Sequence, residues 1–312
     1  MSKPKVLLTR RIPSSALRTL EEHCDVDRNE GGPLSPTELL ARVGGQQGIV
    51  CLMTDAITAD VMASAIDLKV IANVAVGYNN IDVPAARARR IIVTNTPDVV
   101  TEATADLAWA LIMDITRRVS EGDRLVRRGG WKGWAFDFML GTGLRGKQLG
   151  IIGYGRIGRA VAARAEAFGM TVAYSSASAA PGSDAIQIDR LLATSDVVTL
   201  HCPLTPETTH LINQASLARM KRSAYLINTS RGPVVDEAAL AWALKNRMIS
   251  GAALDVYEDE PNVHPELLML ENVVLVPHVG SATTETRTAM ADLAVRNTIA
   301  VLAGQGPITP VP

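Results

Sequence analysis

Gln148-Leu-Gly-Ile-Ile-Gly153-Tyr-Gly155-Arg-Ile-Gly158 is the stretch that decides the fold. Its glycines have the spacing G-x-G-x-x-G, follow a predicted buried strand and open a helical pattern that continues to Phe168. In this context the first glycine permits a tight turn, the second lets the backbone approach a pyrophosphate, and the third allows close helix packing. The helix N-terminus adds partial positive charge. The motif therefore predicts a dinucleotide site that includes Gly153, Gly155, Arg156, Ile157 and Gly158, and the alternative is a glycine-rich turn without a ligand.

Short apolar runs alternate with helical patterns on both sides of this motif, which is typical of parallel sheets covered by helices. Six strands are predicted from the motif onward, at residues 148–152, 171–174, 197–200, 225–228, 251–254 and 273–276. Four more are predicted before it, at residues 5–9, 48–53, 70–74 and 91–94. We therefore expect an α/β protein with two doubly wound parallel sheets.

A long helical pattern separates the two series of strands. It begins near Thr101 and has Leu107, Leu111, Ile115 and Val119 at four-residue spacing, which predicts one spacer helix. The tail after Thr288 is helical again but too short to form a domain. We expect this tail to pack back onto the first domain.

Composition excludes several classes of protein. The 312 residues are 47% hydrophobic and 20% charged, which fits two globular domains at about 150 residues each and does not fit disorder. Lys+Arg 31 against Asp+Glu 32 leaves no basic excess for nucleic acid. No apolar stretch approaches the roughly 18 residues of a membrane helix, and the N-terminus lacks a signal-peptide core. We expect a cytoplasmic protein with neither nucleic acid nor a membrane as partner.

The three cysteines are too few and too scattered for a disulfide framework, and none has the paired spacing of a zinc site. We expect reduced thiols in the core and no metal.

Cofactor choice depends on the end of the second strand of the motif. NAD-binding folds usually place a carboxylate there, against the ribose 2′-hydroxyl. Here the sequence reads Tyr174-Ser175-Ser176-Ala177-Ser178, with no carboxylate before Asp184. Hydroxyls of Ser175, Ser176 and Ser178 can donate to a 2′-phosphate, with Arg156 as the nearest cation. The pattern favours NADP(H), and the alternative is a polar turn that accepts NAD(H) as well.

Three loops with ionisable residues follow the last three predicted strands. They are Asn228–Gly232 with Arg231, Asp255–Pro261 with its carboxylates, and Pro277–Ser281 with His278. Ligands of open α/β sheets bind outside the carboxyl ends of the strands, so the three loops are expected to meet beside the dinucleotide. An arginine, a carboxylate and a histidine at that place indicate a catalytic set.

With these loops, several further motifs resemble the D-isomer-specific 2-hydroxyacid dehydrogenase family, most of all its glyoxylate/hydroxypyruvate reductases. The further motifs are Asn73–Asp82, Asn95–Ala108, Gly130–Trp134 and His201–Thr205. The resemblance covers nearly the whole chain. It implies two Rossmann-like domains: a discontinuous, flavodoxin-like substrate domain of residues 1–98 and 288–312, and a cofactor domain of residues 99–287.

The resemblance also implies the roles of the catalytic set. Arg231 clamps the substrate carboxylate, a task that suits a planar guanidinium. His278 donates a proton to the 2-oxo group as hydride arrives from the nicotinamide. Glu260, chosen over Glu258 by the family match alone, binds the other imidazole nitrogen and orients the ring.

Other matches imply the remaining binding residues. The substrate would contact Leu52, Met53, Val76, Gly77, Trp134 and Ser281, and the cofactor Thr104, Pro203, Thr208, Thr229, Asp255 and Gly280. Trp134 matches a tryptophan that reaches across a dimer to close a small substrate pocket. The alternative is that Trp131 and Trp134 only pack within their loop.

We therefore expect an NADPH-dependent reductase that converts glyoxylate to glycolate and hydroxypyruvate to D-glycerate, and acts as a homodimer. The homodimer rests on the resemblance and on the apolar helix at residues 107–119. One alternative is an NAD-dependent dehydrogenase of another D-2-hydroxy acid, but a phosphorylated substrate would need cations around Leu52–Asp55, where the sequence has none. A remote alternative is a non-catalytic, dinucleotide-sensing scaffold that resembles a corepressor of this family.

Overall fold

The computed structural model describes residues 2–177, 180 and 182–312. Its contacts divide the chain into unit 1, residues 1–100 with 281–312, and unit 2, residues 101–280. The predicted boundary at residues 287 and 288 falls inside the last helix, whereas the contacts divide the chain before that helix begins at Thr284. Ser281 is the first residue of the second segment of unit 1, and its carbonyl accepts the Thr283 amide at 2.9 Å.

Unit 1 is a parallel sheet of five strands in the order β2-β1-β3-β4-β5. This is the flavodoxin-like order, so the predicted fold is confirmed. The strands are β1 Lys5–Leu8, β2 Asp25–Arg28, β3 Gly48–Cys51, β4 Val70–Asn73 and β5 Ile92–Thr94. The helices are α1 Ser14–His23, α2 Pro36–Arg42, α3 Ala59–Ser64, α4 Val83–Ala88 and α12 Thr284–Leu302.

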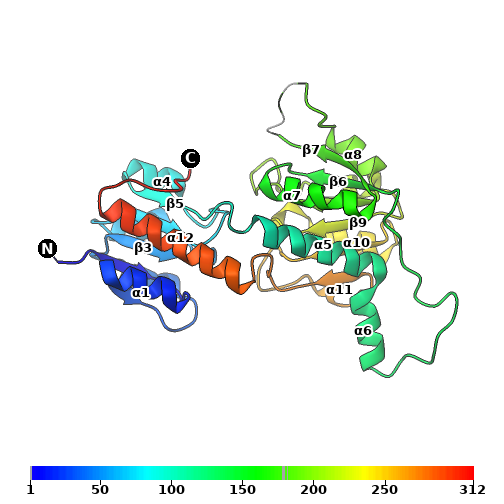
Figure 1. Ribbon diagram of the computed structural model, residues 1–312, viewed down its shortest axis with the longest axis horizontal. Helices are drawn as coiled ribbons and strands as arrows, with labels where there is room; N and C mark the ends of the chain where they lie inside the picture. The colour runs from blue at the N-terminus through cyan, green and yellow to red at the C-terminus, as the bar shows by residue number, and fades with distance from the viewer. Residues whose placement is uncertain (1, 178–179, 181) are drawn as a thin grey trace. The chain divides into compact units, whose positions relative to one another are not determined.

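Both faces of this sheet are covered, which explains why β3 and β4 are apolar at nearly every buried position. On one face α12 packs along β3, β4 and α1, and Figure 1 shows the red α12 beside the blue α1. On the other, Leu39, Val61 and Met62 from α2 and α3 pack against Ile49 and Ile71. The tail therefore packs onto the first unit, as the sequence predicted.

Unit 2 is a parallel sheet of six strands in the order β11-β10-β9-β8-β6-β7. The strands are β6 Gln148–Ile152, β7 Thr171–Ser175, β8 Val197–Leu200, β9 Tyr225–Asn228, β10 Gly251–Leu254 and β11 Val273–Leu275. The helices are α5 Thr101–Arg117, α6 Val119–Arg127, α7 Arg156–Ala165, α8 Ile188–Thr194, α9 Gln214–Arg219, α10 Glu237–Lys245 and α11 Pro265–Leu268, with 3-10 turns η1 Glu166–Phe168 and η2 Gly232–Val234. The predicted series of strands is confirmed.

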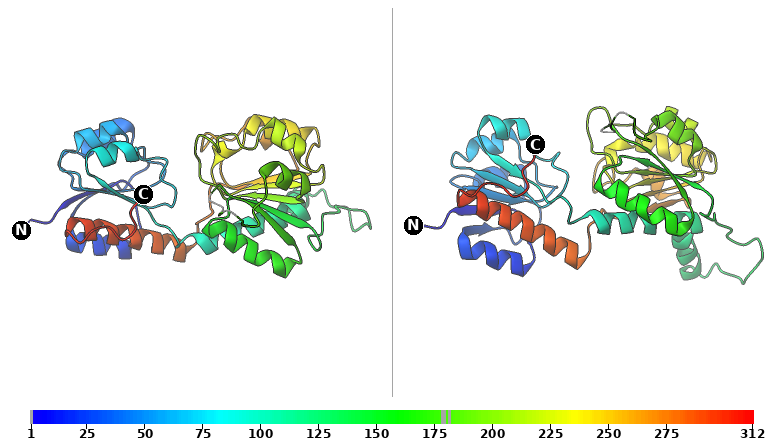
Figure 2. Two further views of the ribbon diagram at one scale, coloured as in Figure 1. Left: turned by 90° about the horizontal axis from the view of Figure 1, so that it is seen from above. Right: turned by 45° about the horizontal axis from the view of Figure 1, so that its top comes forward.

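Helices form a layer on each face of this sheet as well, as Figure 2 shows. Side chains of α5 and α7 pack with Leu149, Ile151 and Ile227 on one face. Those of α8, α9 and α10 pack with Leu200 and Leu226 on the other. Because β6 pairs with both β7 and β8, the chain changes direction along the sheet at β6. In doubly wound sheets this switch point is where ligands bind.

Two elements differ from the prediction. Strand β2 was not predicted, because it pairs only with β1 at the sheet edge and its side chains are mostly polar and partly exposed. The predicted single spacer helix is two helices, since Arg118 between α5 and α6 has a left-handed φ of 57°. Val119 therefore belongs to α6 and is 58% exposed, whereas Leu111 and Ile115 are buried.

All three cysteines are free and buried, in agreement with the prediction. Among the described residues, no helix has the length and apolar character needed to cross a membrane.

Candidate active site

The three predicted catalytic residues follow three neighbouring strands of unit 2. Arg231 follows β9, Glu260 follows β10 and His278 follows β11, and these strands are adjacent in the sheet. The carboxyl ends of parallel strands meet at one edge, so the three loops lie together, as the sequence indicated.

His278 and Glu260 form a direct pair. The Nδ1 atom of His278 lies 2.8 Å from one Glu260 carboxylate oxygen and 3.1 Å from the other. Burial by itself would raise the pKa of Glu260, but the hydrogen bond and charge of His278, the Tyr257 amide and the charge of Arg231 together lower it. Glu260 is therefore held as a carboxylate that orients the imidazole.

The backbone around His278 is held by Asp255, which is 1% exposed. One Asp255 oxygen accepts the amide of Val279 at 2.6 Å and the other accepts the amide of Gly280 at 2.9 Å. These bonds maintain a left-handed φ of 51° at His278, a conformation that is unfavourable for a residue with a Cβ. Burial raises the pKa of Asp255, although these amides and His278 oppose the rise.

Arg231 is held by a turn centred on the buried Asn228. The Asn228 side chain donates to the Arg231 carbonyl at 2.9 Å and accepts the Ser230 amide at 3.0 Å. The next residue, Gly232, lies against the segment that carries Glu260, because a Cβ there would come within 1.8 Å of the Tyr257 carbonyl group. Burial lowers the pKa of Arg231, and the charge of Glu260 opposes this change.

The glycine motif has the geometry of a phosphate-binding turn. Gly153 has a φ of 96° and lies so close to the backbone of residues 201 and 202 that a Cβ would clash at 2.4 Å. Gly158 likewise packs against Gly153, with a clash at 2.2 Å. A Cβ on Gly155 would meet nothing within 4 Å, so the space over this residue, at the N-terminus of α7, is open to a ligand. Arg156 begins α7, and Ile157 is partly buried against the core.

Predicted cofactor residues also lie in the loop after β8 and on α5. Thr208 closes a turn by donating to the Pro203 carbonyl at 2.7 Å and accepting the Thr205 amide at 2.8 Å. Thr104, on α5, is buried. Its side chain lies 3.7 Å from the position that a Cβ on Gly280 would occupy.

Thr229 lies beside His201, a histidine for which the sequence predicts no role. Its hydroxyl is 3.5 Å from Nδ1 of His201, and Nε2 of this imidazole is 2.9 Å from the Thr199 hydroxyl. Burial lowers the pKa of His201 to about 3, so the ring is neutral between the two threonines.

At the end of β7, Ser175 and Ser176 are partly buried, and Ser178 lies outside the described residues. The preceding Tyr174 stacks on Tyr154 from the glycine motif, with ring centroids 3.9 Å apart. The Arg159 guanidinium lies 6.0 Å from the centre of the Tyr154 ring.

Four predicted substrate residues of unit 1 lie in loops after the carboxyl ends of β3 and β4, and all four are partly buried: Leu52, Met53, Val76 and Gly77. Asparagine side chains hold the second loop. Asn73 donates to the Gly77 carbonyl at 2.8 Å, and Asn95 donates to the Val76 carbonyl at 2.8 Å.

The loop after β3 is held by Asp55, whose carboxylate accepts the Leu52 amide at 2.8 Å. Arg10, from the loop after β1, donates to the Thr54 hydroxyl at 3.0 Å and lies 3.6 Å from the Asp55 carboxylate. The prediction that no cation lies near Leu52–Asp55 is therefore wrong, because folding brings β1 beside β3.

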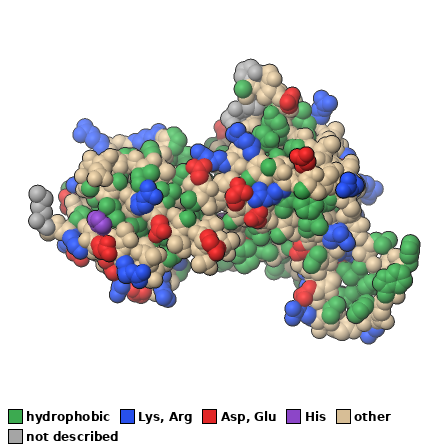
Figure 3. Space-filling model, in the orientation of Figure 1, with side chains coloured by type: hydrophobic (Ala, Val, Ile, Leu, Met, Phe, Trp, Pro, Cys, Tyr) green, Lys and Arg blue, Asp and Glu red, His purple; other side chains and the backbone are tan. Residues whose placement is uncertain are grey.

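Trp134 belongs to an exposed apolar surface on α6 and the segment that follows it. We call this the arm surface and define it by Val119, Val126, Trp131, Trp134, Phe136, Phe138 and Leu140. Trp134 is 82% exposed and Phe136 is 85% exposed, so neither packs into its own unit. Helix α6 has no buried residue. Figure 3 shows hydrophobic side chains gathered over this region.

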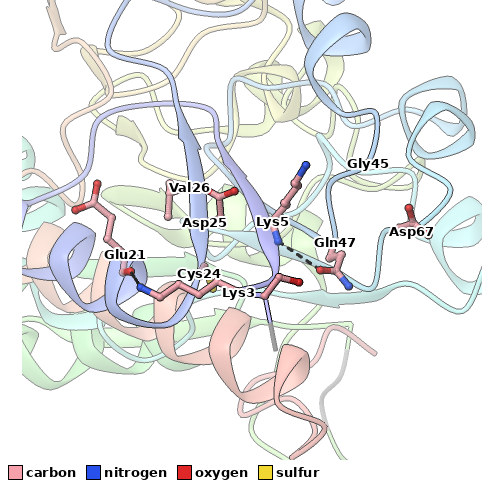
Figure 4. Close-up of a pocket in the computed structure, with 10 residues that line it drawn as sticks. Lys3, Lys5, Glu21, Cys24, Asp25, Val26, Gly45, Gln47 and Asp67 are labelled. Carbon is pink, nitrogen blue, oxygen red and sulfur yellow. Dashed lines mark hydrogen bonds between the residues drawn. The ribbon is translucent and has the colours of Figure 1, made fainter.

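Figure 4 shows a hollow in unit 1 that is lined by side chains of both charges. It lies at the amino ends of the unit 1 strands, whereas the predicted substrate loops lie at the carboxyl ends of β3 and β4. The hollow is lined by residues that include Lys3, Lys5, Glu21, Asp25 and Asp67. Lys3 is bound to the Glu21 carbonyl at 2.7 Å, and none of the described residues that line the hollow is a predicted site residue. Among the described residues, no cluster of His, Cys, Asp or Glu is arranged to hold a metal ion.

Comparison with known proteins identifies relatives over almost the whole chain. The family model for the NAD binding domain of D-isomer specific 2-hydroxyacid dehydrogenase matches residues 109–280. A glyoxylate reductase from Thermococcus litoralis is 46% identical over 316 residues, which cover 98% of this chain and 96% of the relative. One from Thermofilum pendens is 47% identical, covering 98% and 94%.

Solved structures agree with this similarity. A crystal structure of a protein from Thermus thermophilus has a TM-score of 0.94 and 47% identity, covering 99% of this chain and 100% of that chain. The NADPH-dependent glyoxylate/hydroxypyruvate reductase of Sinorhizobium meliloti, solved in complex with NADP and malonate, has a TM-score of 0.89 and 36% identity, covering 99% and 97%.

Proposed function

Because the chain belongs to the D-isomer specific 2-hydroxyacid dehydrogenase family, we propose that it reduces glyoxylate and hydroxypyruvate with NADPH, to glycolate and D-glycerate. The observation that carries this proposal is the His278–Glu260 pair beside the Arg231 turn, at the carboxyl ends of β9, β10 and β11. This is the acid, orienting base and carboxylate-binding cation that reduction of a 2-oxo acid requires.

The residues present fit a nicotinamide dinucleotide. Gly153 and Gly158 close the turn too tightly for any side chain, while Gly155 leaves open space at the helix N-terminus, where a pyrophosphate is stabilised. The turn, Thr208 and Thr229 would hold the dinucleotide. When bound, its reduced nicotinamide supplies the hydride for the carbonyl carbon.

His278 supplies the proton. Its Nδ1 is engaged by Glu260, so Nε2 is the nitrogen that exchanges a proton with the substrate oxygen. In reduction His278 donates this proton to the 2-oxo group, and in oxidation it accepts the proton from the hydroxyl. Glu260 keeps the ring oriented throughout.

Arg231 binds the substrate carboxylate through its guanidinium, which suits bidentate pairing with a planar anion. As the family resemblance implies, we also assign the backbone amides of Val76 and Gly77 to the substrate carboxylate, and Leu52, Met53 and Ser281 to the substrate side chain.

NADPH is proposed over NADH because β7 ends in hydroxyl residues rather than in a carboxylate that would repel a 2′-phosphate. The Sinorhizobium meliloti relative, described as NADPH-dependent, supports this choice.

We also propose that the enzyme is a homodimer that covers the arm surface, including Trp134. The apolar face of α5, which by its sequence is a candidate dimer surface, packs instead against the sheet of its own unit. The arm surface remains exposed, and exposed apolar patches of this kind mark association sites.

The test is the initial rate of glyoxylate reduction, followed by absorbance loss with NADPH and, in parallel, with NADH. We expect a higher kcat/KM with NADPH. A preference for NADH would overturn the cofactor proposal and retain the chemistry. No rate with glyoxylate, hydroxypyruvate or other 2-oxo acids would overturn the enzymatic proposal and favour the scaffold.

A further inference from the structure

We propose that Glu237 is a positioning residue for catalysis, because it binds both ends of the turn that carries Glu260. Glu237 is the first residue of α10, and no motif in the sequence predicts a role for it. The catalytic consequence of this inference rests on the proposed function.

The Glu237 carboxylate is the central contact of this turn. Glu237 is only 4% exposed. One oxygen accepts the amide of Glu258 at 2.6 Å and the other accepts the amide of His264 at 3.0 Å. Glu260 lies between these two anchor points. A single buried side chain therefore fixes where the turn leaves β10 and where it enters α11.

Glu258 returns the interaction. Its carboxylate accepts the Glu237 amide at 3.0 Å and also pairs with His210, from the loop that contains Thr208. On its other side the turn touches Gly232, where even a Cβ would lie 2.5 Å from the Glu258 amide nitrogen. The turn is thus packed between the Arg231 segment and Glu237, and it has little room to shift while both contacts remain.

A shift of this turn would change the distance between Glu260 and His278. Glu260 keeps its lowered pKa through the His278 hydrogen bond and charge, the Tyr257 amide and the charge of Arg231, which together outweigh burial. Among the residues that the structure describes, Asp255, the Tyr257 hydroxyl and Glu237 itself are further titratable groups that interact within this cluster. If Glu260 moves away from His278, the stabilising contacts weaken and the pKa of Glu260 rises.

The experiment compares Glu237→Ala with Asp236→Ala in the full-length protein. Asp236 is the N-cap of the same helix, and its side chain accepts the Ala239 amide, within α10, at 2.9 Å. Its loss weakens α10 and leaves the Glu237 contacts in place. Glu237→Gln, which keeps one acceptor oxygen, serves if the alanine variant does not fold.

The primary readout is the pH midpoint of the Glu260 carboxyl signal in carbon-13 NMR, assigned with Glu260→Gln. In Glu237→Ala we expect the midpoint to rise by about 1 unit, and kcat with glyoxylate to fall about tenfold at unchanged KM for NADPH. In Asp236→Ala we expect lower thermal stability but an unchanged midpoint.

An unchanged midpoint in Glu237→Ala, or an equal shift in Asp236→Ala, would overturn the inference. The titration needs no turnover, so it decides the role of Glu237 even if the wild-type protein reduces no 2-oxo acid. Absence of turnover with every 2-oxo acid would overturn only the proposed function.

Discussion

At the scale of single residues, His278 combines an oriented ring with a strained backbone. Its Nδ1 is bound by Glu260 and its φ of 51° is maintained through Asp255. We expect His278→Ala to lower kcat by about 10²- to 10⁴-fold, because the proton donor is lost, while NADPH affinity stays nearly unchanged. Single-turnover kinetics and fluorescence titration measure the two quantities.

The control for this substitution is His23→Ala, which removes an exposed histidine at the end of α1. It should leave the rate unchanged. Loss of NADPH binding in His278→Ala would contradict the assigned role, because it would place the ring in cofactor binding.

The pH dependence of the enzyme should reflect Glu260. Glu260 orients His278 only when Glu260 is ionised. Activity is therefore present above the Glu260 pKa and is lost as the pH falls through this pKa. Because His278 and Arg231 lower that pKa, the acid limb of kcat/KM should lie below the ordinary value of 4.5. A pH profile measures this, with Glu260→Gln expected to remove the limb and reduce the rate. An acid limb well above 4.5 that persists in Glu260→Gln would assign it to another group.

At the scale of elements, two turns of unit 2 contain glycines for different reasons: Gly155 leaves space for a ligand, and Gly232 allows close backbone packing. In Gly155→Ala the added methyl group meets no protein atom, so we expect unchanged thermal stability and at least about tenfold weaker NADPH binding. In Gly232→Ala the methyl group overlaps the Tyr257 backbone, so we expect a loss of about 3 kcal/mol or more. Urea unfolding and fluorescence titration separate the two effects. Equal NADPH affinity in Gly155→Ala and wild type would contradict the phosphate turn.

The tail after α12 supports a loop far away in the sequence. Asn297 donates to the Thr309 hydroxyl at 2.8 Å, which donates to the Asn95 carbonyl at 2.6 Å, and the Asn95 side chain holds Val76. We expect Thr309→Val to cost about 1–3 kcal/mol and to raise the KM for glyoxylate more than the KM for NADPH. Thr309→Ser retains the hydroxyl and should restore both. If Thr309→Val changes stability alone, the tail has no role in substrate binding.

At the scale of the whole molecule, the arm surface predicts association. Trp134→Ser with Phe136→Ser should leave the fold intact, because both side chains are more than four-fifths exposed, and should shift the protein toward monomer. Sedimentation velocity over a range of concentrations measures this. Met269→Ser is the control, since Met269 is 83% exposed outside the arm surface. An identical sedimentation profile for the double variant and wild type would contradict the proposal that this surface forms a dimer.

The local part of this structure could be predicted from the sequence. Apolar runs located nearly every strand, and the glycine spacing located the dinucleotide turn, because both signals depend on residues close in the chain. Where side chains lacked the pattern the prediction failed. Strand β2 is mostly polar because it lies at an edge, and the break at Arg118 has neither glycine nor proline to mark it.

The sequence by itself determined the fold class and the family, and it predicted Arg231, Glu260 and His278 as the catalytic residues. Only the tertiary structure decided which contacts hold the catalytic turn and the loop after β3 in place. Glu237 reaches His264 across 27 positions, and Arg10 reaches Thr54 across 44, so neither contact leaves a periodic signal. Such contacts follow from strand order, which places distant loops at one sheet edge. There a buried carboxylate or guanidinium must find hydrogen-bond partners wherever the chain provides them.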